Sequence, residues 1–278
     1  MKKYTYPSVL TIAGFDGSGG AGIQGDLKAI SATGCYGTSV LTAIAVQNTC
    51  GVKSIFPIPS SVVEEQIITI MDDIFPNAIK IGMVHSSELV ETITNTLQKY
   101  THTPIVFDPV MVATSGHKLI EDSTIEAIIH KLFPIASVIT PNLDEAAILA
   151  KMPINNVEDM YVAGKRIMKL GCKSVLMKGG HLPSMKLTSL YFTSDDRIIE
   201  YHFDKIETKN THGSGCTLSS AIASNLAQGF DVQDSVKFGQ EYVHGAIDNG
   251  KDVITGKGNG PLNHFYNPVK LKKNELVK

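Results

Sequence analysis

Short apolar runs alternate with helical segments along almost the whole sequence, and this alternation narrows the folds that the chain can adopt. A short apolar run bounded by turn residues is typical of a buried strand. Strands that alternate with helices form a mainly parallel sheet that is covered by helices on both faces. We therefore expect an α/β fold, with strands over residues 9–13, 38–46, 54–58, 78–81, 104–107, 136–139 and 174–177.

The segments between these strands have helical patterns. Residues 61–64 match the capping-box pattern, which predicts that a helix begins there. Two alternating segments, 187–193 and 198–203, flank a pair of aspartates and predict a β-hairpin. A further helix is expected to start at Asp231. The remaining helices are expected over residues 23–32, 87–100, 122–132 and 157–170, with one more directly after residue 216.

Composition and charge exclude several classes of function. The formal net charge is −2 and no basic block occurs, so nucleic acid is not an expected partner. No apolar run is long enough to span a membrane, and residues 9–13 are too short for the core of a signal peptide. The four cysteines stand singly and the nine histidines show no zinc spacing, so we expect reduced thiols and a cytoplasmic location. Nothing divides the 278 residues, and we expect one domain over residues 1–278 with an irregular tail from about residue 256.

A small, flexible loop at residues 211–216, with the sequence THGSGC, leads into an alanine-rich helical pattern. The unpaired amides and the positive dipole end of a helix start form an anion site. A cysteine at such a start is expected to have a lowered pKa, which makes Cys216 a candidate base or nucleophile. The alternative is a packing loop in which Cys216 is a small buried residue.

The first predicted strand leads into a second glycine-rich loop. Gly17, Gly19 and Gly22 match the G-x-G-x-x-G pattern, but a dinucleotide site also needs an acidic residue about 20 positions further on, and residues 27–63 contain none. We therefore exclude a dinucleotide site. Two interpretations stay open: a tight turn, or a loop shaped for the close approach of a small ligand. Asp26, one turn into the next helix, either points back at that ligand or is a carboxylate favoured by the helix dipole.

Five side chains follow the ends of predicted strands: Gln47, Met83, Asp108, Glu145 and Lys178. Ligands of open parallel sheets bind beyond the carboxyl ends of the strands. Each residue alone has a structural explanation, such as ending a strand or opening a helix, but their shared location indicates a site. Two carboxylates, a lysine and an anion loop predict phosphoryl transfer with Mg²⁺, which takes one or two carboxylates together with phosphate oxygens.

A series of motifs, in order along nearly the whole chain, resembles one family. The sequence is similar to the ribokinase superfamily and, within it, to the hydroxymethylpyrimidine and phosphomethylpyrimidine kinases of thiamine biosynthesis. Cys216 stands where most of the superfamily has an aspartate, as is usual in this branch. The matching segments are AG at 13–14, SGGAGIQ at 18–24, DLK at 26–28, LTA at 41–43, QNT at 47–49, KIGM at 80–83, DPVM at 108–111, TPNL at 140–143, EA at 145–146, KGGH at 178–181 and THGSGCT at 211–217.

The resemblance implies a ribokinase-like three-layer αβα sandwich, ATP as co-substrate, Mg²⁺ as cofactor and a homodimer. It implies that 4-amino-5-hydroxymethyl-2-methylpyrimidine is phosphorylated first, and that the monophosphate is then converted to the diphosphate. By motif, the residues that would contact the pyrimidine are Gly14, Asp26, Gln47, Met83, Val110 and Cys216. Asp108 and Glu145 would lie near Mg²⁺, Lys178 and Thr211 near the ATP phosphates, and Gly213, Gly215 and Cys216 would form the catalytic anion hole.

Other functions are compatible with parts of this pattern. A pyridoxal kinase of the same branch shares the glycine loop and the cysteine, although residues 47–49 favour a pyrimidine, because the Gln47 amide can both donate and accept along an edge with an amino group. A non-catalytic sensor would not need the carboxylates, and a sugar or nucleoside kinase would have the usual aspartate at position 216. Phe15, Gly17 and Gly25 depart from the residues that are commoner in the family, and Phe15 adjoins the expected acceptor loop.

Overall fold

A nine-stranded, mostly parallel sheet forms the centre of the protein in a computed structural model that describes residues 2–100, 102–111, 120–180, 182 and 185–276. The strand order within these residues is β10-β9-β8-β7-β6-β5-β2-β3-β4. The six strands from β8 to β3 in this order are parallel, whereas β4, β9 and β10 run antiparallel to their neighbours. The strands are β2 (Ser8–Asp16), β3 (Tyr36–Asn48), β4 (Gly51–Pro57), β5 (Ala78–Ile81), β6 (Ile105–Phe107), β7 (Val138–Ile139), β8 (Val175–Met177), β9 (Lys186–Phe192) and β10 (Ile198–Asp204).

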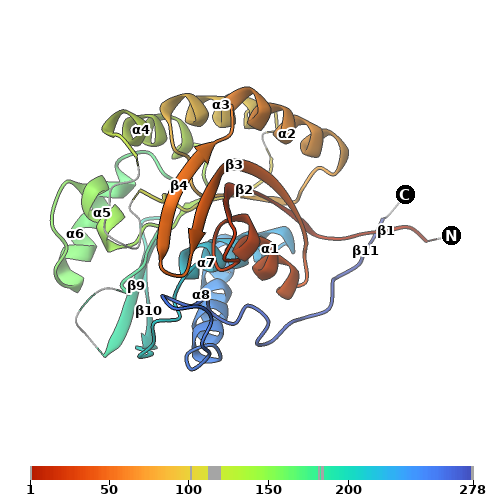
Figure 1. Ribbon diagram of the computed structural model, residues 1–278. Helices are drawn as coiled ribbons and strands as arrows, with labels where there is room; N and C mark the ends of the chain where they lie inside the picture. The colour runs from red at the N-terminus through yellow and green to blue at the C-terminus, as the bar shows by residue number, and fades with distance from the viewer. Residues whose placement is uncertain (1, 101, 112–119, 181, 183–184, 277–278) are drawn as a thin grey trace.

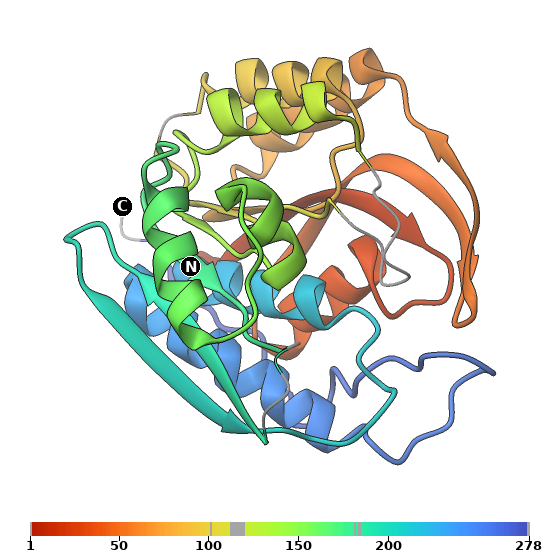
Figure 2. The same cartoon turned by 90° about the vertical axis from the view of Figure 1, so that its left-hand side faces the viewer.

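Helices cover both faces of the sheet, as the two perpendicular views show (Figure 1, Figure 2). One layer consists of α1 (Gly22–Ala32), α7 (Ser214–Ala227) and α8 (Val232–Asp248). The other layer consists of α2 (Ser60–Asp73), α3 (Ser87–Leu97), α4 (Asp122–Ala127), α5 (Leu143–Ala150) and α6 (Val157–Met168). Each layer has its own apolar core against the sheet. The predicted α/β fold with three layers is confirmed.

The alternation of side chains along the buried strands produces the two cores. In β5, Ile79 and Ile81 pack in the core on the side of α2 to α6, whereas Ala78 packs in the core beneath α1 and α7. Lys80 shares the face of Ala78, because successive residues of a strand point to opposite sides of the sheet. The sheet therefore places a lysine with no exposed surface between its own backbone and the layer of α1 and α7.

All the predicted strands and the predicted hairpin are present, and the differences from prediction lie at helix ends. The predicted capping box at residues 61–64 is wrong: α2 begins at Ser60, and the carbonyl of Pro59 accepts the N–H groups of Val62 and Val63. Residues 122–132 form α4 and then a π turn (Ile128–Leu132), rather than one α-helix. Asp231 caps α8 as expected, since its side chain accepts from the N–H of Asp234.

The two ends of the chain lie together at one side of the molecule (Figure 1). The tail is largely irregular from residue 256, as predicted, but it ends in β11 (Asn274–Glu275), which pairs with β1 (Tyr4–Thr5). None of the helices in the described residues combines the length and the apolar character needed to cross a membrane.

Candidate active site

Two glycine-rich loops pack on each other at the carboxyl ends of the parallel strands. Gly213 has a φ of +83°, and a Cβ atom at this position would lie 1.8 Å from the carbonyl oxygen of Gly20. Gly22 has a φ of +54°, and its Cβ would lie 2.3 Å from the carbonyl oxygen of Gly14. Only glycine fits these two positions, because a side chain would collide with backbone and because positive φ disfavours other residues. The loop at residues 14–22 and the loop at residues 211–216 therefore form one continuous surface.

The loop at residues 211–216 has the geometry predicted for an anion site. Gly213 is the N-cap of α7, and the first turn of the helix contains Ser214, Gly215 and Cys216. The N–H of Ser214 donates to the carbonyl of Thr211 at 3.1 Å. The next first-turn amides have no partner within a helix, because no preceding turn exists to accept them. The backbone at Gly215 and Cys216 can therefore donate to an anion, with the helix dipole in the favourable direction.

Asp108, Lys178 and Gly215 meet directly beside this loop. Lys178 Nζ lies 3.0 Å from Asp108 Oδ1, and the hydroxyl of Thr140 donates to the same oxygen at 2.8 Å. A Cβ atom on Gly215 would lie 3.3 Å from Asp108 Oδ2 and 3.4 Å from Lys178 Nζ. Asp108, predicted to lie near the metal, and Lys178, predicted to lie near ATP, are thus paired directly beside the anion loop. Lys178 is therefore held in an ion pair at this edge of the sheet rather than solvated.

Glu145 lies next to this pair and also caps a helix. Its Oε2 accepts the N–H of Asn142 at 2.8 Å, and the Asn142 side chain accepts the N–H of Glu145, which completes a capping box at the start of α5. Burial and the negative charge of Asp108 raise the pKa of Glu145 to about 7, although Lys178 opposes the shift. Glu145 therefore opens a helix, as its structural explanation required. Its carboxylate also lies near Asp108.

The charges of this cluster depend on one another. Burial alone would raise the pKa of Asp108, but Lys178 and Lys80 hold it below its ordinary value. Burial alone would lower the pKa of Lys178, but Asp108 and Glu145 raise it. Two adjacent carboxylates repel each other when both are ionised, and a divalent cation would relieve that repulsion. The described residues contain no cluster of three or more His, Cys, Asp or Glu side chains that could hold a metal. Two carboxylates can hold Mg²⁺ together with waters and phosphate oxygens, because this ion binds few protein ligands.

Cys216 lies at the junction of the two glycine loops and is partly exposed. The N–H of Gly22 donates to its sulfur. Burial raises the pKa of the Cys216 thiol to about 11, and the carboxylates of Asp26 and Asp108 add to this, against the opposing effect of Lys80. The predicted lowering of the pKa is wrong: in this position desolvation and nearby negative charge outweigh the helix start, and the thiol is protonated at neutral pH.

Asp26 forms a buried ion pair with Lys80 underneath the loops. Lys80 Nζ lies 2.9 and 2.8 Å from the two carboxylate oxygens, and neither side chain has exposed surface. The hydroxyls of Thr11 and Ser220 donate to the same carboxylate at 2.6 and 2.8 Å. Four contacts from three elements besides its own helix hold the group below the open face of the site. The predicted contact of Asp26 with the pyrimidine stays a prediction, and the structure shows Asp26 in its pair with Lys80.

The other residues predicted to contact the pyrimidine, which would accept the phosphoryl group, surround the end of β2. The pairing of β2 with β3 shifts register at Gly14, between Ala13 and Phe15. A Cβ on Gly14 would lie 3.9 Å from Met83 Sδ. Gln47 is partly exposed at the end of β3. Val110 is partly exposed after β6, and its N–H donates to the carbonyl of Asp108 at 2.9 Å. Thr211 is exposed at the start of the anion loop.

The two departures from the family pattern at Phe15 and Gly17 are complementary. A Cβ on Gly17 would lie only 3.3 Å from the Phe15 ring, so the small residue leaves room for the large one. Phe15 is partly buried on the acceptor side of the loop at residues 14–22.

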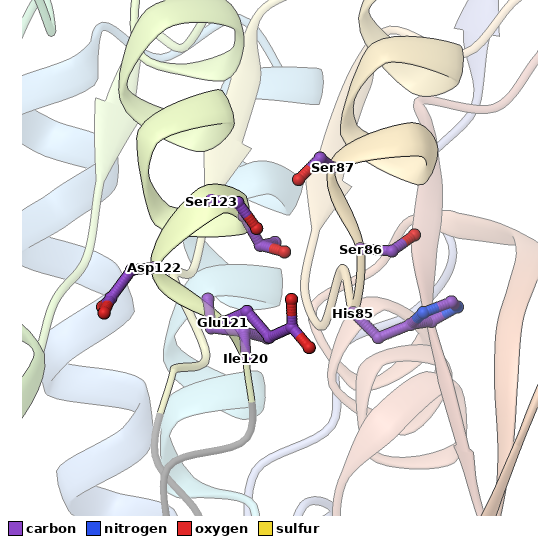
Figure 3. Close-up of a pocket in the computed structure, with 8 residues that line it drawn as sticks. His85, Ser86, Ser87, Ile120, Glu121, Asp122 and Ser123 are labelled. Carbon is purple, nitrogen blue, oxygen red and sulfur yellow. The ribbon is translucent and has the colours of Figure 1, made fainter.

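Two hollows flank this cluster. One, of about 650 Å³, lies between the starts of α3 and α4 and is lined by His85, Ser86 and residues 120–124 (Figure 3). The second, of about 280 Å³, adjoins Thr211 and is lined by residues 208–210, 251–256 and 258. None of the predicted site residues lines either hollow among the described residues, but the second lies directly beside the expected phosphate end of the site.

Sequence reasoning missed four residues that hold the site together: Asp16, Lys80, His212 and His264. Asp16 ends a strand in the same way as the residues that were singled out, which was the available signal. Lys80 lies in an apolar strand, where a lone lysine indicates a buried partner. His264 comes from the irregular tail, and nothing in its local sequence indicates that it packs beneath α7.

His264 fastens the tail to the helix that carries the anion loop. Its Nε2 lies 3.1 Å from the hydroxyl of Thr217, and the hydroxyl of Tyr242 donates to its carbonyl at 2.6 Å. The ring is 4% exposed, and burial lowers its pKa to about 4, with Lys28 and His212 adding to the effect. His264 is therefore neutral in the folded protein at neutral pH.

Comparison with known proteins gives one consistent family. The profile of a protein family described as phosphomethylpyrimidine kinase matches residues 16–263. The chain is 43% identical over 258 residues to a hydroxymethylpyrimidine/phosphomethylpyrimidine kinase of Rhizobium meliloti, which covers 92% of this chain and 96% of that protein. It is 42% identical over 263 residues to a chloroplastic thiamine biosynthetic bifunctional enzyme of Arabidopsis thaliana, covering 94% of this chain and 50% of that enzyme.

A solved structure shares the fold over nearly the whole chain. The pyridoxal kinase of Staphylococcus aureus in complex with AMP-PCP and pyridoxal is 33% identical and superposes with a TM-score of 0.87, covering 98% of this chain and 100% of that one.

Replacing Lys80 by methionine should lower the free energy of unfolding by about 3–5 kcal/mol, because Asp26 would be left as a buried charge without its partner. Urea unfolding measures this. The matched control is Lys251→Met, which removes the same kind of pair, at 2.7 Å, from the surface and should have a much smaller effect. Equal effects of the two substitutions would contradict the structural role of the buried pair.

His264 should make stability depend on pH. Its pKa is lower in the folded state than in the unfolded chain, so the unfolded chain binds more protons between about pH 6.5 and 4, and acid favours unfolding. The free energy of unfolding should therefore fall by up to about 3 kcal/mol across this window because of His264 alone. His264→Gln should remove that part of the slope, whereas His202→Gln, at an exposed histidine, should not; equal slopes in all three proteins would refute the assignment.

Proposed function

The chain belongs to the phosphomethylpyrimidine kinase family, and from that membership we propose that it phosphorylates 4-amino-5-hydroxymethyl-2-methylpyrimidine and then its monophosphate, using ATP, in thiamine biosynthesis. The observation that carries the proposal is the contact of the anion loop at Gly215 with the Asp108–Lys178 pair. That contact brings backbone donors, a cation and a carboxylate to one point. Phosphoryl transfer needs little beyond such positioning and neutralisation of charge.

The phosphate end of the site supports this chemistry. The amides of Gly213, Gly215 and Cys216 would donate to the oxygens of the transferred group, where charge is stabilised most effectively in a desolvated site. Lys178 would add a positive charge next to them. Mg²⁺, when bound, neutralises and orients the phosphates, and Asp108 and Glu145 are the residues that would hold it. In the transfer, a bond forms between the acceptor oxygen and the γ-phosphorus as the bond to the leaving ADP oxygen breaks, and the proton of the acceptor hydroxyl passes to an oxygen of the transferred phosphoryl group or to solvent.

The nucleotide and the acceptor would approach from opposite sides of the anion loop. We place the ATP base and ribose near the hollow beside Thr211, because residues 208–210, which lead directly into the anion loop, form part of its lining. Gly14, Gln47, Met83 and Val110 would hold the pyrimidine at the end of β2. Asp26 would act from below, by fixing the loops through Lys80 rather than by touching the substrate.

Cys216 is proposed as a member of the anion hole and not as the base. A thiol with a pKa of about 11 is almost entirely protonated at neutral pH and cannot accept a proton. Its backbone N–H can still donate to a phosphate oxygen, and its side chain can pack against the hydroxymethyl arm. A loose transition state places little demand on a strong base, so the reaction does not require a thiolate.

A pyridoxal kinase is the second candidate function. The structural likeness to the S. aureus pyridoxal kinase favours it, since it extends over nearly the whole of both chains. Sequence identity favours the pyrimidine, with 43% to the pyrimidine kinase against 33% to the pyridoxal kinase. The shared fold therefore does not distinguish a pyrimidine substrate from pyridoxal. The residues that contact the substrate ring determine which of the two is phosphorylated.

We also propose that residues 1–278 act as a single catalytic domain and as a homodimer that pairs through β3 and β4. Apolar side chains are exposed on these strands, including Val46, Val52 and Phe56, the last at 58%. Exposed apolar surface on an edge hairpin is typical of an interface. The cytoplasmic location and the lack of a nucleic-acid partner stay predictions.

The substrate proposal predicts the products of ATP turnover. With the hydroxymethylpyrimidine as acceptor, mass analysis should show the monophosphate and then the diphosphate, and the monophosphate supplied alone should also be consumed. Pyridoxal should be a poorer acceptor by kcat/KM. Phosphorylation of pyridoxal alone would move the protein to the second function, and ATP turnover with none of the three would refute both.

The assignment of Cys216 predicts how its variants respond to pH. At saturating substrates, kcat should change little between pH 7.5 and 9.5, whereas a thiolate base of such high pKa would give a rise of about tenfold per pH unit. Cys216→Ser should keep this flat profile with a modest loss of kcat. Gly213→Ala should lose far more, because its side chain collides with Gly20 and displaces the loop. A steep rise in the wild type that disappears in Cys216→Ser would restore the base role.

A further inference from the structure

Asp16 joins the acceptor-side loop to the anion loop through its buried carboxylate. The group is 1% exposed at the end of β2. Its Oδ1 accepts the N–H and the hydroxyl of Ser18 at 2.8 and 2.7 Å, and its Oδ2 accepts the N–H of Ala21 at 2.7 Å. Across the interface between the loops, Oδ2 also lies 2.8 Å from His212 Nε2. One carboxylate therefore fixes the shape of the first loop and the position of a side chain from the second.

The direction of these hydrogen bonds follows from the charge of Asp16. Burial alone would raise its pKa, but bonds from His212, Ser18, Ala21 and Gln47 hold it well below the ordinary value. An ionised carboxylate only accepts, so His212 Nε2 carries a proton and donates it. Gln47 is the weakest of these four neighbours, and an ionised carboxylate would attract the NH₂ end of its amide. The carbonyl oxygen of Gln47 would then be left to accept from a ligand, such as the amino group of a pyrimidine.

The neighbouring backbone leaves the loops little freedom to adjust by another route. His212 is held on its other side by its N–H, which donates to the carbonyl of Gly260 at 3.1 Å, and by a bridge to Pro261. The next residue, Gly213, is in contact with Gly20. A shift of the His212 ring would therefore also move Gly213 and Gly215, which would face the transferred phosphoryl group.

We propose that Asp16 and His212 are positioning residues that set the distance between the acceptor oxygen and the transferred phosphoryl group. The inference rests on the proposed function, because it assumes that the acceptor lies on the side of Gln47 and the phosphate on the side of Gly215. The acceptor is held by the first loop and the phosphoryl group by the second, and the Asp16–His212 bond ties the two together. Asp16 also affects binding of the acceptor through its neighbour Gln47, whereas His212 affects only the position of the phosphoryl group.

Steady-state kinetics with the best acceptor of the wild type test this division. His212→Ala should lower kcat by about 10- to 100-fold, as expected for a small misplacement of reacting groups, with the acceptor KM nearly unchanged. His212→Gln should recover part of the loss, because its amide can donate to Asp16. Asp16→Asn should lower kcat similarly and also raise the acceptor KM by about 5- to 10-fold, since the negative charge that attracts the Gln47 amide is lost. The double variant should resemble Asp16→Asn alone, because both substitutions break the same link.

Controls separate positioning from general stability and from the proposed function itself. His202→Ala removes an exposed histidine that also contacts a threonine and a glutamate, and it should leave kcat unchanged. If His212→Ala lowers the melting temperature but not kcat, or if the two substitutions are additive, the inference is overturned. If Asp16→Asn does not fold, the comparison of His212→Ala with His212→Gln decides, and equal kcat values in those two would overturn it. A wild type that phosphorylates none of the tested acceptors would contradict the proposed function instead.

Discussion

The buried ion pair between Lys80 and Asp26 is the interaction on which the arrangement of the site depends. It joins β5 to α1, and the hydroxyls of Thr11 and Ser220 extend it to β2 and α7. Removing two charges from water is costly, and the cost is offset only when the pair is close and its remaining oxygens are hydrogen-bonded. Here both conditions are met, so the pair locks the helix starts of α1 and α7 to the sheet. The two glycine loops immediately precede those helix starts, which is why their positions follow from this pair.

The same pair shapes the electrostatics above it. Lys80 and Lys178 stand against Asp26, Asp108 and Glu145, so the cluster holds more carboxylates than cations. Burial is the main reason why the Cys216 thiol keeps its proton and why the pKa of Glu145 is raised, and the nearby carboxylates add to both effects. The surplus of carboxylates explains why nucleotide phosphates would need a divalent cation in addition to Lys178. A site of this kind is incomplete without its ligands, since the ligands supply the compensating charges.

Sequence analysis predicted the sheet and brought together several side chains that the structure places at its carboxyl edge, and its errors have physical causes. The apolar runs predicted β2, β5 and their parallel neighbours because burial on both faces leaves a clear pattern in sequence. Asp108, Lys178 and Gly215 were grouped correctly because parallel strands end at the same edge. The pKa of Cys216 was wrong because a helix start is visible in sequence, whereas burial and the carboxylates of distant elements are not. The ion pair of Asp26 with Lys80 was not predicted because nothing in sequence links the two residues, which lie 54 positions apart. His264 was missed for the same reason, since its role arises only from long-range packing.

A crystal structure of the complex with a non-hydrolysable ATP analogue, Mg²⁺ and the hydroxymethylpyrimidine would test the central claim most directly. That claim is that the fused glycine loops bring the acceptor and the phosphate together over the Lys80–Asp26 pair. The terminal phosphate should accept from the amides of Gly213 to Cys216 at about 2.7–3.2 Å, with the pyrimidine beside Gln47 and Met83 and the Lys80–Asp26 pair unbroken beneath. Phosphates bound away from this loop, or a pyrimidine that reaches Asp26 by displacing Lys80, would contradict it.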